Sequence, residues 1–187
     1  YTVVTSVISA DPDYDGFDLT NVVVTNQDDE APAAADLYFS LTNSDSDNVL
    51  GLTGGDAKDE DIIVFDGNGF ARVFDGSDVG VTGDIDALAV ISETEILFSL
   101  TLSASLPGIS GSVDDSDIVL FTATQWGDDT DGILSLYFDA SDVELSSDNE
   151  DIDAIELLPD GDLLISTTGS FNVSGASGAD EDLLRFT

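Results

Sequence analysis

The strings FDGSDVGV at residues 74–81 and FDASDVEL at residues 138–145 decide the fold, because the same segments follow both of them. Each is followed by an Asp-Ile-Asp-Ala sequence, then by a short apolar segment, and finally by an acidic turn that leads into a second apolar segment. These later segments are DIDAL (84–88), ILFS (96–99) and DSDIVLF (115–121) in one unit, and EDIDAI (150–155), LLIS (163–166) and DEDLLRF (180–186) in the other. An ordered set of matching segments indicates an internal repeat.

A more divergent first copy precedes these two. It contains GFDL (16–19), LYFS (37–40) and DEDIIVF (59–65) in the same order, and Asp18, Asp86 and Asp153 lie 68 and 67 residues apart. Turn-forming clusters separate the copies. The sequence therefore predicts one domain over residues 1–187, made of three repeats at about 1–67, 68–129 and 130–187.

The predicted fold class is all-β. The apolar segments are short, rich in Val, Ile, Leu, Phe and Thr, and separated by Gly, Asp, Ser and Asn, which is typical of strands. Four such segments per repeat predict propeller-blade-like, four-stranded sheets. Three blades do not close a ring, so we expect two chains that complete six blades, an open stack with pairing edges at residues 2–9 and 182–186, or a compact β-prism or sandwich.

The quoted strings resemble a repeat of uncharacterised secreted bacterial β-repeat proteins, some of which end in sorting signals. The resemblance covers residues 68–187 well and the first copy loosely. It implies an exported, propeller-like repeat protein. It supplies no catalytic residue.

Charge and composition exclude several classes of function. The formal net charge is −37, since 40 acidic residues face only Lys58, Arg72 and Arg185. Nucleic acids and anionic membranes bind basic surfaces, so we expect neither as a partner. No apolar run is long enough for membrane insertion. Without Cys or His, thiolate sites and the usual general base are missing. The absence of Met suggests a processed chain or a fragment, and we expect it to be secreted, extracellular or at the cell surface.

The acidic residues favour Ca²⁺ as the bound ion. Asp outnumbers Glu 32 to 8, and Asp is the residue of turns and calcium loops. The string DPDYDG at residues 11–16 has the Asp-x-Asp-x-Asp-Gly form of such a loop. Val22 stands where an EF-hand has Glu, so a loop between strands is expected. Its predicted ligands are Asp11, Asp13, Asp15 and Asp18; the alternative is a solvated Asx turn.

The repeats supply a second set of candidate calcium ligands. They are Asp75, Asp78, Asp84, Asp86, Asp115 and Asp117 in the second repeat, and Asp139, Asp142, Asp151, Asp153, Asp180 and Asp182 in the third. Alternatively, these residues cap strand ends and keep sheet edges soluble. A body with this charge needs cations to offset its self-repulsion, and a surface adapted to high salt would satisfy the same need.

Catalysis is not expected. The pairs Asp84–Asp86 and Asp151–Asp153 have the i, i+2 spacing that places two carboxylates on one strand face, where they could serve as general acid and base, but nothing else supports an enzyme. Trp126 is a candidate for stacking on a carbohydrate, with packing between sheets as the alternative. Asn172-Val173-Ser174 matches a glycosylation sequon.

The sequence thus predicts a secreted, calcium-stabilised structural or self-assembling protein, such as a filament, sheath or surface-layer subunit. The alternative is a non-catalytic binding module for carbohydrate or peptide, closed by dimerisation or by a longer parent chain.

Overall fold

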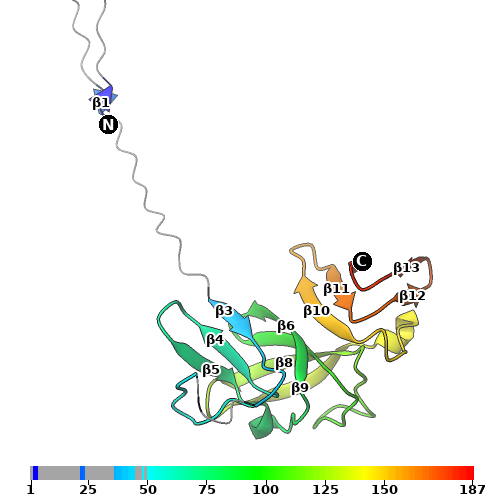
Figure 1. The fold of residues 1–187 in the computed structure, drawn as a ribbon, viewed down its shortest axis with the longest axis horizontal. Helices are drawn as coiled ribbons and strands as arrows, with labels where there is room; N and C mark the ends of the chain where they lie inside the picture. Colours follow the sequence, from blue (N-terminus) through cyan, green and yellow to red (C-terminus); the bar gives the residue numbers. More distant parts are fainter. Residues whose placement is uncertain (1, 4–21, 24–35, 45–47, 49) are drawn as a thin grey trace, which may run out of the picture. The chain divides into compact units, whose positions relative to one another are not determined.

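The structure, a computed structural model, describes residues 2–3, 22–23, 36–44, 48 and 50–187 (Figure 1). Contacts divide the chain into two units, Tyr1–Ala35 and Asp36–Thr187. In the first unit, β1 (Thr2–Val3) pairs antiparallel with β2 (Val22–Val23). The second unit contains the sheets described below. The described residues form strands and two short 3-10 turns, without an α-helix, so the all-β fold class is confirmed.

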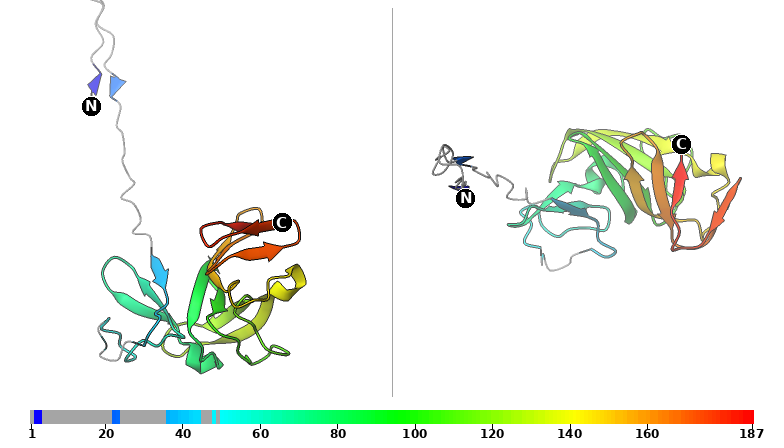
Figure 2. Two further views of the ribbon diagram at one scale, coloured as in Figure 1. Left: turned by 45° about the vertical axis from the view of Figure 1, so that its right-hand side comes forward. Right: turned by 90° about the horizontal axis from the view of Figure 1, so that it is seen from above.

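Three antiparallel sheets and a hairpin make up the second unit (Figures 1 and 2), and none of the sheets closes on itself. The first sheet contains β3 (Leu37–Phe39), β4 (Ile62–Phe65) and β5 (Phe70–Phe74). The middle sheet contains β6 (Ile85–Ser92), β7 (Glu95–Leu100), β8 (Ile118–Gln125) and β9 (Asp131–Phe138). The third contains β10 (Ile152–Leu157), β11 (Leu163–Thr167) and β14 (Leu184–Phe186). The hairpin pairs β12 (Phe171–Val173) with β13 (Ala176–Gly178).

The first and middle sheets each take their last strand from beyond a predicted repeat boundary. The boundaries lie near residues 67 and 129, yet β5 pairs with β4 and β9 pairs with β8. After each of these strands the chain forms a 3-10 turn, η1 (Gly76–Val79) or η2 (Ala140–Val143), and then enters the next sheet. The strings that define the repeat therefore lie at the crossings between sheets.

The middle sheet packs against other residues on both faces, because successive side chains of a strand point to opposite faces and both sets include apolar residues. Ile85, Phe98 and Phe121 lie in an apolar cluster shared with Ile62 and Phe74 of the first sheet. The neighbouring positions on the same strands face a second cluster, shared with the third sheet. That cluster includes Ala87, Leu97, Ile118, Ile152, Leu163, Ile165 and Leu184. The sheets are thus joined by two separate cores, one on each side of the middle sheet.

Candidate functional site

The crossings between sheets are built around two buried aspartates, Asp61 and Asp117, which are 0% and 6% exposed. Asp61 precedes β4 and accepts hydrogen bonds from the backbone N–H of Lys58 at 2.9 Å and of Gly76 at 3.3 Å. One carboxylate therefore joins the turn before a strand to the 3-10 turn after the next strand. We call each such arrangement an aspartate junction.

The second junction reproduces the first. Asp117 precedes β8 and accepts from the backbone N–H of Asp114 at 2.8 Å and of Ala140 at 2.9 Å. Burial raises the pKa of Asp61 and of Asp117, while these N–H donors oppose the rise. In both junctions the donors are backbone N–H groups at equivalent positions, and the acceptor is an aspartate at an equivalent position. The two matching sequence segments therefore form matching hydrogen bonds.

The aspartates of the 3-10 turns act as caps. Asp75 accepts from the backbone N–H of Ser77 at 3.2 Å, and Asp139 accepts from that of Ser141 at 3.2 Å. Both are the N-cap residues of their turns, where a carboxylate satisfies a free N–H group. Asp78 in η1 accepts from the N–H of Thr130 at 2.8 Å. Asp75 and Asp139 thus bind backbone amides of their own turns, whereas Asp78 binds a backbone amide of the next predicted repeat.

The remaining candidates of the repeats lie at corresponding places. Asp142 lies in η2, and Asp180 and Asp182 lie in the turn before β14, where Asp182 accepts from the N–H of Ala179 at 3.0 Å. Asp84 and Asp151 immediately precede β6 and β10. The candidates of the predicted N-terminal calcium loop, Asp11, Asp13, Asp15 and Asp18, lie outside the described residues.

Arg72 of β5 occupies the first junction. Its side chain is 5% exposed, and its guanidinium forms ion pairs with Asp61 at 3.1 Å, Asp75 at 2.9 Å and Asp128 at 3.2 Å. It also donates to the carbonyl oxygen of Asp56 at 2.8 Å. A buried cation with three carboxylates compensates charges that would otherwise repel one another.

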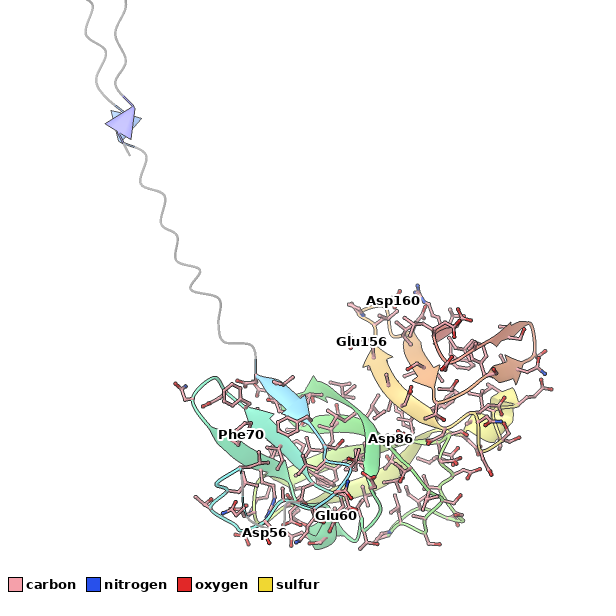
Figure 3. The ribbon with its side chains drawn as sticks, in the orientation of Figure 1. Asp56, Glu60, Phe70, Asp86, Glu156 and Asp160 are labelled. Atoms are coloured by element: carbon pink, nitrogen blue, oxygen red, sulfur yellow. The ribbon has the colours of Figure 1, made fainter. Side chains whose placement is uncertain are left out.

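A cluster of carboxyl groups lies where β6 and β10 meet (Figure 3 labels Asp86 on β6). We define this inter-sheet carboxyl cluster as Asp86, Asp115, Asp151 and Asp153. Burial, together with the charges of the other three residues, raises the pKa of Asp151 to about 7. Burial and the charge of Asp153 also raise the pKa of Asp86, while its hydrogen bond with Asp151 acts in the opposite direction.

The cluster can therefore hold a proton near neutral pH. With Asp151 protonated, its hydrogen bond with Asp86 is the contact of a carboxylic acid with a carboxylate. Asp151 has one buried carboxyl oxygen without a hydrogen-bond partner among the described residues, and so has Asp84, two residues before Asp86. In the described part of the chain, no group of three or more acidic residues is arranged to hold a metal ion.

Trp126 lines a groove of about 550 Å³ next to Tyr38, Val90 and Arg72. Its ring stacks edge to face on Phe121 at 5.5 Å between ring centroids, and its indole N–H donates to the carbonyl oxygen of Glu93 at 2.9 Å. These contacts fit the packing interpretation, while the partly exposed ring still borders the groove. Asn172 of the sequon is exposed in β12.

Sequence reasoning missed three residues that connect the elements. Ser99 is buried in β7 and bonds across to β10; Glu150 accepts from the backbone N–H groups of Ser146, Ser147 and Asn172; and Arg72 pairs with three aspartates. Of these three, only Arg72 could have been singled out from the sequence, because it is one of three basic residues among 40 acidic ones. A lone Ser or Glu in an acidic, Ser-rich sequence carries none.

Comparison with protein-family models, with curated proteins and with solved structures finds no match for this chain. Among the described residues, no helix has the length and apolar character to cross a membrane.

Proposed function

We propose that this protein is a non-catalytic structural component that associates through its repeats. The observation that carries the proposal is the aspartate junction, which fastens one sheet to the segment leading into the next. A junction of this kind depends on no feature of the chain ends, so the same contacts can join sheets of different molecules. Self-association thus needs no new type of interface.

The chemistry of the described side chains supports a structural role. Asp75, Asp117 and Asp139 are engaged by backbone N–H groups, and Arg72 is enclosed by carboxylates. These groups hold the protein's own backbone. The acidic surface favours an environment rich in cations, such as the cell exterior, and Ca²⁺ is the proposed stabilising ion.

Particle mass and shape test the proposal. Light scattering and electron microscopy would be carried out in millimolar calcium and in excess chelator at equal ionic strength. We expect large regular assemblies in calcium and smaller particles after chelation. A monomer under both conditions would refute self-association.

A second candidate, carbohydrate binding, is favoured by the groove that Tyr38 and Trp126 line. Aromatic rings at a groove can stack on the apolar face of a sugar. Titration of Trp126 fluorescence with oligosaccharides tests this function, since Trp126 is the chain's single tryptophan. A saturable change that Tyr38→Ala weakens would support it, and an unchanged spectrum throughout would remove it.

A further inference from the structure

The outer edge of β14 corresponds to an edge that is covered in both earlier sheets. β14 follows Asp182 as β4 follows Asp61 and β8 follows Asp117. In the first two sheets the next strand pairs with this edge, β5 on β4 and β9 on β8. In the part of the chain that the structure describes, β14 pairs with β11 alone.

The pairing of the two covered edges is the same in detail. Ile62 lies opposite Phe74, and Ile118 lies opposite Phe138. In both sheets the register shifts directly after this first pair, between Ile62 and Ile63 and between Ile118 and Val119. A shared bulge at a shared position indicates that the covering segments follow one geometry.

Leu183 shows that the third edge is built to be covered. It occupies the position of Ile62 and Ile118, which are both 0% exposed, yet it is itself 64% exposed. Ile62 packs in a core with Phe74, Val81 and Ile85, whereas Ile118 packs in the next core. That next core contains Ala140, Leu145 and Ile152. In the repeat these residues are equivalent to Gly76, Val81 and Ile85. Among the described residues, Leu183 thus lacks the covering segment that buries Ile62 and Ile118, and an exposed apolar side chain of this size marks an interaction site.

Asp182 is equivalent to the aspartates that accept a backbone hydrogen bond from the covering segment in the earlier sheets. Asp61 and Asp117 each accept two backbone N–H groups, one from their own turn and one from the covering segment. Asp182 accepts the first of these from Ala179 through Oδ2, the same oxygen that Asp61 and Asp117 use for their own turns. Its Oδ1 corresponds to the oxygen that accepts from Gly76 or Ala140 in the earlier repeats. The carbonyl oxygens of Asp59 and Asp115 accept from Ile85 and Ile152, and Asp180 holds the corresponding position.

We propose that the edge formed by Asp180, Asp182, Leu183 and β14 binds a segment of this repeat's own type. The segment consists of a strand like β5, the Asp-(Gly/Ala)-Ser-Asp-Val turn, and the first residue of a strand like β6. It pairs with β14, donates a turn N–H to Asp182 and covers Leu183 with its apolar residues. This inference deepens the proposed self-association, because it names the surface and the segment that the surface takes.

The test uses the full chain and a fluorescein-labelled synthetic peptide of residues 68–88, which contains β5, η1 and Ile85. Fluorescence anisotropy at 0.15 M salt measures binding, and a scrambled peptide of equal composition is the control. We expect saturable binding of the native peptide only. A peptide with Val81→Ser and Ile85→Ser loses the apolar contacts and binds at least about tenfold more weakly.

Three variants of the protein locate the contact, and all three positions are exposed, so the fold is retained. Leu183→Ser removes the apolar contact, and Asp182→Asn removes one of two acceptor oxygens; we expect each to weaken binding about tenfold. Glu181→Gln changes the same charge at the adjacent residue and leaves the affinity unchanged. Absence of saturable binding at millimolar peptide, or equal affinity in Leu183→Ser and the parent, would overturn the proposal.

The two proposals fail separately. Peptide binding that depends on Leu183, in a protein that stays monomeric, would sustain this edge and refute self-association. Assemblies that form equally well with Leu183→Ser, combined with no peptide binding, would sustain self-association and refute this edge.

Discussion

The hydroxyl of Ser99 in β7 donates a hydrogen bond to the carbonyl oxygen of Ile152 in β10 at 2.7 Å, and so ties the middle sheet to the third. The same hydroxyl accepts from the N–H of Ala87 at 3.1 Å. Ser99 is 0% exposed, and both of these hydrogen bonds are buried. The Ser99 hydroxyl therefore forms hydrogen bonds with backbone groups of β6 and β10 and links the two sheets.

Ser99→Ala is expected to lower the free energy of unfolding by about 1–3 kcal/mol, because it leaves a buried donor and a buried acceptor unpaired. Denaturant titration measures the loss. Ser166→Ala is the matched control at the equivalent position of the third repeat, where the partly exposed hydroxyl donates to Asp153. Equal effects of the two substitutions would contradict the linking role of Ser99.

Arg72→Met is expected to cost about 3–5 kcal/mol, since it leaves the buried carboxylate of Asp61 without its cation. Thermal and denaturant unfolding give the value. Arg185→Met removes the same charge from an exposed pair with Asp160 and should change stability little. Adding Asp61→Asn to Arg72→Met should restore part of the loss, and a failure to do so would place the role of Arg72 in packing.

Asp151→Asn is expected to stabilise the protein at pH 8 and to have little effect at pH 5. The folded-state pKa of about 7 lies above the ordinary value of 3.8, so the folded state binds more protons between these limits and stability falls as pH rises through them. After allowance for solvent screening, the gain at pH 8 is about 1–2 kcal/mol.

Melting temperatures from pH 4 to pH 9 test this dependence. Asp129→Asn removes one negative charge from an exposed turn and controls for the general effect of net charge. A stabilisation by Asp151→Asn that is the same at pH 5 and pH 8, or is matched by Asp129→Asn, would exclude a local origin in the inter-sheet carboxyl cluster.

Glu144→Gly is expected to stabilise the protein by about 1 kcal/mol. Glu144 caps η2 with φ 71°, a left-handed conformation that favours glycine, and Gly80 occupies the equivalent place after η1 with φ 81°. Gly80→Ala should destabilise instead, because an added Cβ would lie 2.7 Å from Pro107. A destabilised Glu144→Gly would mean that the glutamate side chain contributes more than its backbone strain costs.

Calcium is expected to raise the melting temperature at constant ionic strength. An ion present at 100 times its dissociation constant adds about 2.7 kcal/mol to the free energy of unfolding, which is roughly 5–10 °C for a chain of this size. Scanning calorimetry in calcium and in chelator measures the shift. A double variant, Asp13→Asn with Asp15→Asn, should reduce it if the N-terminal loop is the site. An equal shift on adding sodium alone would indicate diffuse screening of the acidic surface.

The local pattern of the sequence determined the strands and the turns of the all-β fold. Alternating apolar residues and short Asp- and Ser-rich turns act through nearest neighbours, so strands such as β7 and β8 and the capping roles of Asp75 and Asp139 follow from local chemistry. The capping alternative for the repeated aspartates was also open from sequence alone.

Only the tertiary structure decided which strands share a sheet and which aspartates are buried. Asp61, Asp117 and Asp182 have the same local sequence pattern, yet the first two are buried and the third is exposed, because burial depends on a segment contributed from elsewhere. The pKa of Asp151 is raised in the same way, first by burial and then by the charges of Asp86 and Asp115, which are distant in the chain. Local propensity specifies an element, whereas hydrogen bonds and charges between distant residues specify its neighbours.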